Sequence, residues 1–276
     1  MTHAPQHPIA GTPPSGVLPA AARARPAHRA VLARDGVLVL RRALPRAAID
    51  RLRIAVDQRY DELDRLCATH GPFAVERHLP PGWRYLPTAA SFSLDQLVTG
   101  GATDGIAGTL ANASVRDLVE AALGGPAGLL EGAAWVRRQQ APGNAPDWHR
   151  PHSWHQDGAL GFDFRGHDAQ TIAAAAPRAL VTCWFPLVPC GRGAPGLEWV
   201  AQRLPTLLPP ADLDDARVRA RFGAGRRYAP ALAPGDAVVL CGDLLHRTHV
   251  TAAMQAVRTS IELRFVRTPC TATMPA

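Results

Sequence analysis

The segment 154–158 reads Trp-His-Gln-Asp-Gly and places an imidazole and a carboxylate two residues apart. Side chains two residues apart on a β-strand point to the same face, so His155 and Asp157 could bind one metal ion together. A second histidine would complete the set of two histidines and one carboxylate that holds non-haem Fe(II) and leaves three coordination positions open. The chain has 11 histidines and 23 acidic residues, so a surface turn is the better explanation of the tripeptide taken alone.

A second histidine could come from the segment 234–249, which begins Pro-Gly-Asp and ends His-Arg-Thr-His. Its opening turn, apolar run and second turn predict two successive strands, with His246 at the start of the second. His249 is an alternative ligand on the same strand. Cys241 together with these histidines could also suggest zinc, but no second cysteine stands at zinc-finger spacing.

The last predicted strand, 257–266, has one polar face. Its polar side chains alternate with apolar ones, and they are Arg258, Ser260, Glu262 and Arg264. So regular a polar face indicates that it lines water or a polar cavity. An inward Arg258 needs an anion, and its planar fork fits a carboxylate through two hydrogen bonds. An ion pair with Glu262 or Asp243 is the simpler alternative.

The elements that position these residues begin with a strand at 36–40 and an amphipathic helix at 45–69. Asn112 can cap a second helix, which Gly124 ends. Short strands separated by Pro and Gly follow residue 128, and one helix, 211–221, interrupts them. The candidate strands are 132–141, 153–157, 179–187, 197–200, 236–241, 245–250 and 257–266. Such a series predicts a β-sandwich or barrel rather than alternating β-α-β units.

Two further patterns near these strands invite other interpretations. Gly191 to Gly196 satisfies G-x-G-x-x-G, but Pro195 and the β-type residues after it do not open a helix. A hairpin turn is therefore predicted there instead of a dinucleotide site. His149 and His152 flank the first ligand segment and are predicted to lie at the surface or behind the ligands.

Composition excludes several classes of function. All 30 basic residues are arginine, so no lysine can form a Schiff base or serve a P-loop or kinase site. The net charge of +7 suggests nucleic-acid binding, but residues 1–34 hold four arginines and no acid. The other 242 residues hold 26 arginines and 23 acids, a balance of only +3, which disfavours a nucleic-acid partner.

No apolar run approaches a membrane span, and no signal peptide is visible. The five cysteines are widely spaced and form no C-x-x-C pair, which predicts a reduced, cytoplasmic protein without a membrane partner. Residues 1–26 form a leader rich in Pro, Ala and Arg and are predicted to be disordered, and residues 27–276 are predicted to form a single domain.

The three segments together resemble the phytanoyl-CoA dioxygenase family of Fe(II)/2-oxoglutarate-dependent oxygenases. The likeness rests on Trp-His-Gln-Asp at 154–157, on a Gly-Asp segment ending Leu-His at 235–246, and on Arg-x-Ser at 258–260. It extends from the strand at 35–40 to Phe265. The resemblance implies a mainly β fold with flanking helices, a double-stranded β-helix (a cupin-like jelly roll).

Carried over to this chain, the family's iron ligands correspond to His155, Asp157 and His246. His246 is preferred over His249 because it lies eleven residues after Gly235, as in the family's segment.

The resemblance also implies a site for 2-oxoglutarate. Arg258 would bind its distal carboxylate, with Ser260 in the same Arg-x-Ser pattern, although Arg258 lies one residue further from His246 than is usual. Thr248 matches a hydroxyl of the family, and Trp184 matches a tryptophan that lines the cosubstrate pocket.

The strand 135–142 matches a strand that faces the cavity, so Arg137 and Gln139 are further candidates for cosubstrate binding. Many relatives carry a lysine at the position of Ala141. Its absence here makes an arginine substitute plausible.

The implied function is hydroxylation of a small organic substrate with Fe(II), 2-oxoglutarate and O2, releasing succinate and CO2. Halogenating relatives have Ala or Gly at the position of Asp157, so the carboxylate favours hydroxylation or a related oxidation. The alternatives are a desaturase, cyclase or epoxidase on the same iron, or a metal-binding jelly-roll protein without turnover.

Overall fold

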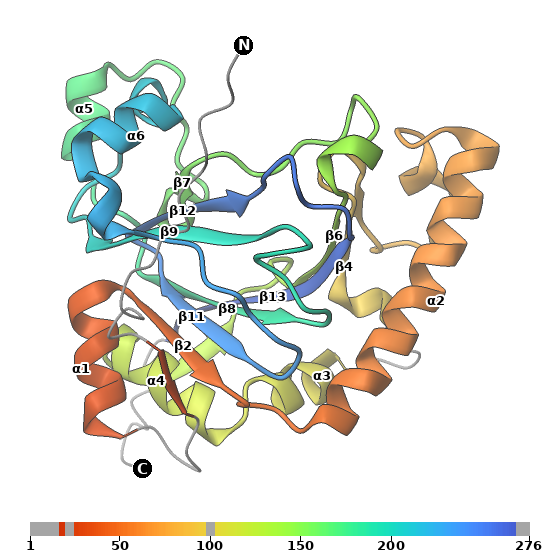
Figure 1. Ribbon diagram of the computed structural model, residues 1–276, viewed down its shortest axis with the longest axis horizontal. Helices are drawn as coiled ribbons and strands as arrows, with labels where there is room; N and C mark the ends of the chain where they lie inside the picture. Colours follow the sequence, from red (N-terminus) through yellow and green to blue (C-terminus); the bar gives the residue numbers. More distant parts are fainter. Residues whose placement is uncertain (1–16, 20–24, 98–102, 269–276) are drawn as a thin grey trace, which may run out of the picture.

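The computed structural model describes residues 17–19, 25–97 and 103–268 of the 276-residue chain. Two β-sheets face each other in this part of the chain, and helices cover their outer faces (Figure 1). The helices are α1 (Pro26–Asp35), α2 (Arg46–His70), α3 (Thr103–Leu110), α4 (Ala113–Leu123), α5 (Ala169–Ala174) and α6 (Asp215–Phe222).

The larger sheet has nine strands within the described residues. Its order is β1 (Val17–Pro19), β2 (Val37–Arg41), β11 (Ala237–Cys241), β8 (Leu180–Pro186), β13 (Arg258–Arg267), β6 (Trp135–Gln139), β4 (Ser91–Ser93) and β3 (Tyr85–Leu86), and β5 (Ala127–Leu129) also pairs with β13. All pairings are antiparallel except that of β1 with β2. The long strand β13 therefore lies in the middle of this sheet.

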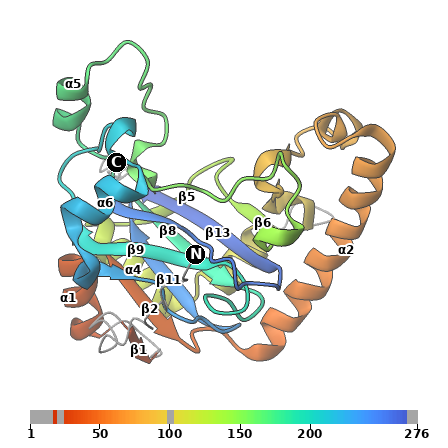
Figure 2. The same ribbon diagram turned by 45° about the horizontal axis from the view of Figure 1, so that its top comes forward.

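The smaller sheet has the order β10 (Arg227–Tyr228), β9 (Gly196–Arg203), β12 (Leu244–His249) and β7 (His155–Gln156). It lies over β8 and β13 of the larger sheet, while α5 and α6 gather at one end of the strands (Figure 2). Two facing antiparallel sheets whose strands alternate between the layers form the predicted double-stranded β-helix, or jelly roll.

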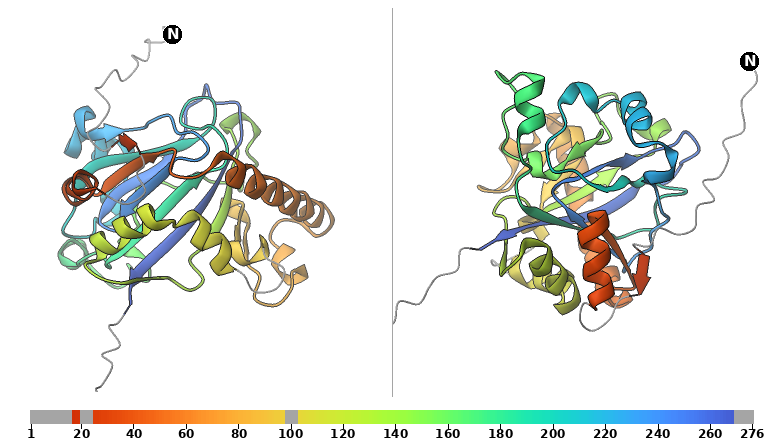
Figure 3. Two further views of the ribbon diagram at one scale, coloured as in Figure 1. Left: turned by 90° about the horizontal axis from the view of Figure 1, so that it is seen from below. Right: turned by 90° about the vertical axis from the view of Figure 1, so that its left-hand side faces the viewer.

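Alternation along the strands divides the apolar residues among three clusters. The first lies between the larger sheet and helices α1, α2 and α4, and it contains Ile261, Leu263 and Phe265 of β13 (Figure 3). The second fills the space between the sheets and includes Trp184 and Trp199. The third packs α6 against the outer face of the smaller sheet. The polar residues of β13 therefore face the space between the two sheets.

Local sequence signals predicted most of these elements correctly. Helix α2 begins after Pro45 and ends at His70, and Asn112 caps α4 by accepting a hydrogen bond from the backbone N–H of Val115 at 3.2 Å. Each of the seven strands predicted after residue 128 is present. The prediction of one interrupting helix was incomplete, because the short helix α5 also lies among the strands.

The prediction of a disordered leader over residues 1–26 was wrong for one short segment. Residues 17–19 form β1, which pairs in parallel with β2 at the edge of the larger sheet. Pro26, at the predicted boundary, is the first residue of α1, as suits a residue without a backbone N–H. Residues 1–16 and 20–24 lie outside the described part of the chain.

The G-x-G-x-x-G segment opens strand β9, so a dinucleotide-binding helix is absent there, as predicted. The hairpin prediction was wrong, because β8 and β9 on either side of the turn belong to different sheets. Gly191 has φ +88°, and a Cβ there would lie 2.3 Å from the carbonyl oxygen of Pro230. The glycine thus permits close approach where the chain crosses between sheets. No helix among the described residues is long and apolar enough to cross a membrane.

Candidate metal centre

Two neighbouring strands of the smaller sheet bring the predicted ligands together. His155 on β7 is the direct partner of His246 on β12, and their ring centroids are 4.3 Å apart. Asp157 follows β7 in a short 3-10 helix, with its Oδ1 3.7 Å from Nε2 of His155 and its Oδ2 3.9 Å from Nε2 of His246. The three ligand atoms lie within 4.8 Å of one another, a spacing that one metal ion can bridge.

Backbone carbonyl groups fix the orientation of both imidazoles. Nδ1 of His155 lies 2.7 Å from the carbonyl oxygen of Ser153, and Nδ1 of His246 lies 3.2 Å from that of Leu244. A proton on each Nδ1 satisfies these contacts and leaves the Nε2 lone pairs directed toward Asp157. Burial, with a smaller contribution from His246, lowers the pKa of His155 to about 4. The ring of His155 is therefore neutral near pH 7, as a metal ligand must be.

The Asp157 carboxylate is held from the opposite sheet. Thr182 on β8 donates to its Oδ2 at 2.5 Å, and the Arg264 guanidinium on β13 donates to its Oδ1 at 3.3 Å. Burial acts to raise the pKa of this carboxyl, yet the Arg264 charge is the largest influence holding it well below its ordinary value. Asp157 is thus an ionised oxygen donor in a fixed position.

The competing histidine lies on the other face of β12. Alternation places His246 and Thr248 toward the cavity, whereas Nδ1 of His249 lies 3.6 Å from Glu198. His149 is buried against Gln139, and His152 lines the cavity, but neither belongs to the ligand cluster found among the described residues. The geometry therefore favours His246 as the third ligand.

Arg258 is a buried cation without a carboxylate partner in the described part of the chain. Its side chain is 1% exposed, its Nη1 makes one long contact of 3.4 Å to the carbonyl oxygen of Gly196, and its Nε has no hydrogen-bond partner. Burial, and then the nearby charge of Arg137, lower its pKa to about 10. Arg258 is still charged near pH 7, and an anionic ligand would supply the partner that it lacks.

The simpler interpretation of Arg258, an ion pair within the protein, does not hold. Both carboxylates proposed for it bind other arginines. Glu262 lies 3.4 Å from Arg137 and 3.2 Å from Arg264, while Asp243 is paired with Arg203 at 2.7 Å. The cavity therefore presents one guanidinium more than the described carboxylates can neutralise.

Most of the predicted cosubstrate residues line the same cavity as the three ligands. Trp184, Thr248, Arg137 and Arg258 do so. The indole Nε1 of Trp184 is buried without a hydrogen-bond partner, and its ring lies 5.5 Å from the Arg258 guanidinium carbon. Two unsatisfied donors in one cavity fit a ligand that carries a carboxylate.

Two predicted residues are not part of the cavity lining. Ser260 is fully buried, and its Oγ has no partner in the structure. Gln139 faces Arg258 across the β6–β13 ladder, but its amide contacts Nε2 of His149 at 2.8 Å. Both lie near Arg258 without contacting the open space.

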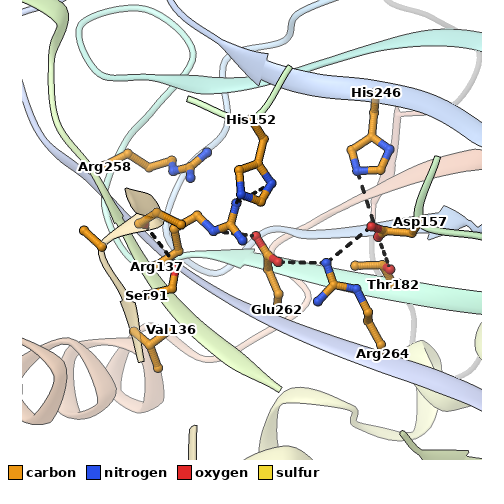
Figure 4. A network of polar contacts seen from close by, with 12 residues as sticks. Ser91, Val136, Arg137, His152, Asp157, Thr182, His246, Arg258, Glu262 and Arg264 are labelled. Carbon is orange, nitrogen blue, oxygen red and sulfur yellow. Dashed lines mark hydrogen bonds and ion pairs between the residues drawn. The ribbon is translucent and has the colours of Figure 1, made fainter. Parts of the chain in front are cut away.

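Sequence reasoning missed the residues that surround Asp157. Figure 4 shows Thr182 and Arg264 contacting this carboxylate from the larger sheet, with Glu262 joined to Arg264. The polar face of β13 gave a signal for Arg264 and Glu262, although not for their partner. Thr182 is the one polar residue in the buried run Leu-Val-Thr-Cys-Trp-Phe-Pro of β8, a position that suggests an inward contact.

Comparisons with known proteins establish the fold. EctD from S. alaskensis, solved with 2-oxoglutarate and 5-hydroxyectoine, matches 88% of this chain and 76% of its own at 15% identity, with a TM-score of 0.60. AviO1 from Streptomyces viridochromogenes Tue57 matches 90% of this chain and 96% of its own at 20% identity, with a TM-score of 0.55.

SnoK is a non-haem α-ketoglutarate-dependent carbocyclase from nogalamycin biosynthesis. It matches 90% of this chain and 87% of its own at 12% identity, with a TM-score of 0.58. No protein-family model and no curated protein sequence matches the chain. At these identities the likeness is one of fold, and it confirms the predicted jelly roll.

Proposed function

We propose that the protein is a non-haem Fe(II)- and 2-oxoglutarate-dependent oxygenase that oxidises a small organic substrate. The observation that carries the proposal is Arg258, a buried guanidinium without a carboxylate partner in the described chain, in the cavity that His155, Asp157 and His246 also line. A metal-binding triad and an anion-binding group in one cavity suit a cosubstrate that must reach both.

Each described group has a task in this proposal. His155, Asp157 and His246 would hold Fe(II), and Arg258 would bind the distal carboxylate of 2-oxoglutarate. Trp184 and Thr248 line the cavity in which the cosubstrate would bind. When bound, Fe(II) and 2-oxoglutarate supply the oxidising power for use of O2, with release of succinate and CO2.

Arg137 is proposed as the substitute for the lysine that many members of the phytanoyl-CoA dioxygenase family carry at the position of Ala141. It lines the cavity, and its Nη1 lies 2.7 Å from the ring nitrogens of His152. Membership of that family remains part of the proposal, as do the single domain over 27–276 and a cytoplasmic location.

Hydroxylation is the proposed reaction, because Asp157 occupies the ligand position that halogenating relatives leave open. EctD, SnoN and SnoK have similar folds, and the last two are described as an epimerase and a carbocyclase. Ring closure, desaturation or epoxidation at the same iron is therefore the alternative within this class. The proposed partner is a small molecule, not a nucleic acid or a membrane.

A jelly-roll protein that binds metal without turnover is the second candidate. The unsatisfied guanidinium of Arg258 favours the enzyme, because a binding protein has no use for a buried cosubstrate anchor that costs stability.

The test is succinate formation by purified full-length protein supplied with Fe(II), 2-oxoglutarate and O2. We expect slow turnover that requires Fe(II) even without the organic substrate, and His246→Ala should abolish it. Metal binding with no succinate release under any substrate panel would favour the binding protein.

A further inference from the structure

Arg264 connects the metal-binding carboxylate to a second buried carboxylate. Its Nη2 lies 3.3 Å from Oδ1 of Asp157 and 3.2 Å from Oε2 of Glu262 (Figure 4). Its side chain is 11% exposed, and those of the two acids are 7% and 9% exposed. One guanidinium nitrogen thus donates to both acids in a nearly dry environment, where such contacts are strong and position-dependent.

Glu262 continues the series toward the other end of the cavity. Its Oε1 lies 3.4 Å from Nε of Arg137, which in turn contacts His152. The order Asp157, Arg264, Glu262, Arg137 alternates negative and positive charge and contains two of each. This series, here called the charge chain, contains as many acids as arginines, and each acid in it is paired with at least one of them.

The two donors to Asp157 approach different oxygens. Thr182 takes Oδ2 and Arg264 takes Oδ1, so rotation of the carboxylate about its last bond breaks at least one contact. Each oxygen also faces one imidazole of the triad. The orientation that serves the two donors is therefore the orientation that offers an oxygen to a shared metal ion.

We propose that Arg264, held by Glu262, is a positioning residue that orients Asp157 for metal binding. The inference rests on the metal site of the proposed function. Lysine could supply the charge of Arg264, but its single ammonium could not also donate to the carbonyl oxygen of Ala133, which Nη1 of Arg264 approaches at 3.5 Å, so it would be held less firmly.

The test measures the dissociation constant of Co(II), an oxygen-inert substitute for Fe(II), by calorimetry on the full chain. We expect Arg264→Gln to weaken Co(II) binding about tenfold or more, the range typical for residues that orient metal ligands. Arg264→Lys should fall between wild type and Arg264→Gln. Arg138→Gln is the matched control. Arg138 follows Arg137 on β6, pairs with Asp64 of α2 and does not contact the triad, so its replacement also breaks an ion pair of an arginine.

The double variant Arg264→Gln/Glu262→Gln separates positioning from charge balance. It removes one charge of each sign, so we expect it to regain thermal stability lost in Arg264→Gln while Co(II) binding stays weak. A wild-type dissociation constant in Arg264→Gln, or its full recovery in the double variant, would overturn the inference. Absence of Co(II) binding to the wild-type protein would instead contradict the metal site itself.

Discussion

Replacing Arg258 by methionine removes a charge from the cavity and keeps an unbranched side chain. This substitution should have opposite effects on the ligand-free protein and on cosubstrate binding. It should raise the free energy of unfolding when no ligand is present, and it should weaken the binding of 2-oxoglutarate. If Arg258 instead belonged to an ion pair within the protein, its replacement would lower the free energy of unfolding of the ligand-free protein.

The magnitude follows from the perturbed ionisation of the guanidinium. Burial and the nearby Arg137 lower the pKa of Arg258 from 12.5 to about 10. A base whose pKa is lower in the folded state destabilises that state at every pH below both values. Each unit corresponds to 1.36 kcal/mol, so the charge costs about 3 kcal/mol at pH 7. Methionine removes this cost, and the melting temperature should rise by roughly 2 to 4 °C for each kcal/mol recovered.

The effect on 2-oxoglutarate follows from the same burial. Removing one partner of a buried, hydrogen-bonded charge pair costs about 2 to 5 kcal/mol, and each 1.4 kcal/mol changes affinity tenfold. We therefore expect the apparent requirement for 2-oxoglutarate to rise roughly 30-fold or more. Co(II) affinity in the absence of 2-oxoglutarate should change little, because Arg258 contacts none of the three ligands in the described structure.

The assay combines thermal unfolding of the ligand-free protein with succinate release at increasing 2-oxoglutarate concentration. Arg267→Met serves as the control, because Arg267 is an exposed arginine at the end of the same strand. A lower melting temperature for Arg258→Met would refute the claim that Arg258 lacks an internal partner. An unchanged 2-oxoglutarate requirement would refute its role as the anchor.

Three further predictions test other parts of the structure. His246→Ala should abolish Co(II) binding measured by calorimetry, whereas His249→Ala should retain it, because His249 contacts Glu198 on the opposite face of β12. Burial acts to raise the pKa of Glu198, but His249 and two arginines hold it at about 2, so its ionised form stabilises the fold above pH 4.5. Glu198→Gln should therefore lower the free energy of unfolding in urea by about 3 kcal/mol at pH 7, and the difference from wild type should shrink as the pH falls from 4.5 toward 2. Asn112→Ala removes the cap of α4 and a 2.8 Å hydrogen bond to the carbonyl of Ala43, and it should cost about 1 to 2 kcal/mol by the same measurement.

Local periodicity accounts for what the sequence predicted well. The alternation of β13 separates Ile261, Leu263 and Phe265, which pack under the helices, from the polar residues that face the cavity. The stripe of α2 and the cap of α4 are equally local. Each of these signals depends only on neighbours within a few residues, so the sequence contains it directly.

The contacts around Asp157 depend on sheet register, which no local pattern specifies. Arg264 lies 107 residues from Asp157 along the chain, and the two meet only because β13 and the end of β7 belong to facing sheets. For the same reason, the sequence could not show that both Glu262 and Asp243 pair with arginines other than Arg258. The sequence identified the polar face of β13, but it could not show which charged residues form ion pairs with one another.

Weak or short elements escaped sequence reasoning for a different reason. Helix α1 buries only His28, Val31 and Leu32, so its apolar stripe is too sparse to stand out after the Pro-rich leader. Helix α5 has six residues and buries only Ile172. Tertiary contacts, more than the pattern of these segments, stabilise their helical form.

The absence of lysine bears directly on how this cavity can hold an anion. A buried ammonium can lose its proton near neutral pH, whereas a buried guanidinium stays charged. The pKa of Arg258, lowered to about 10, still lies well above neutrality, and the charge chain leaves it no described carboxylate. Arg258 therefore destabilises the ligand-free fold as an unpaired buried charge. A carboxylate that binds to it removes this destabilisation, and this favours binding. A permanently charged guanidinium, rather than an ammonium, therefore suits the role proposed for Arg258 as the anchor of the distal carboxylate.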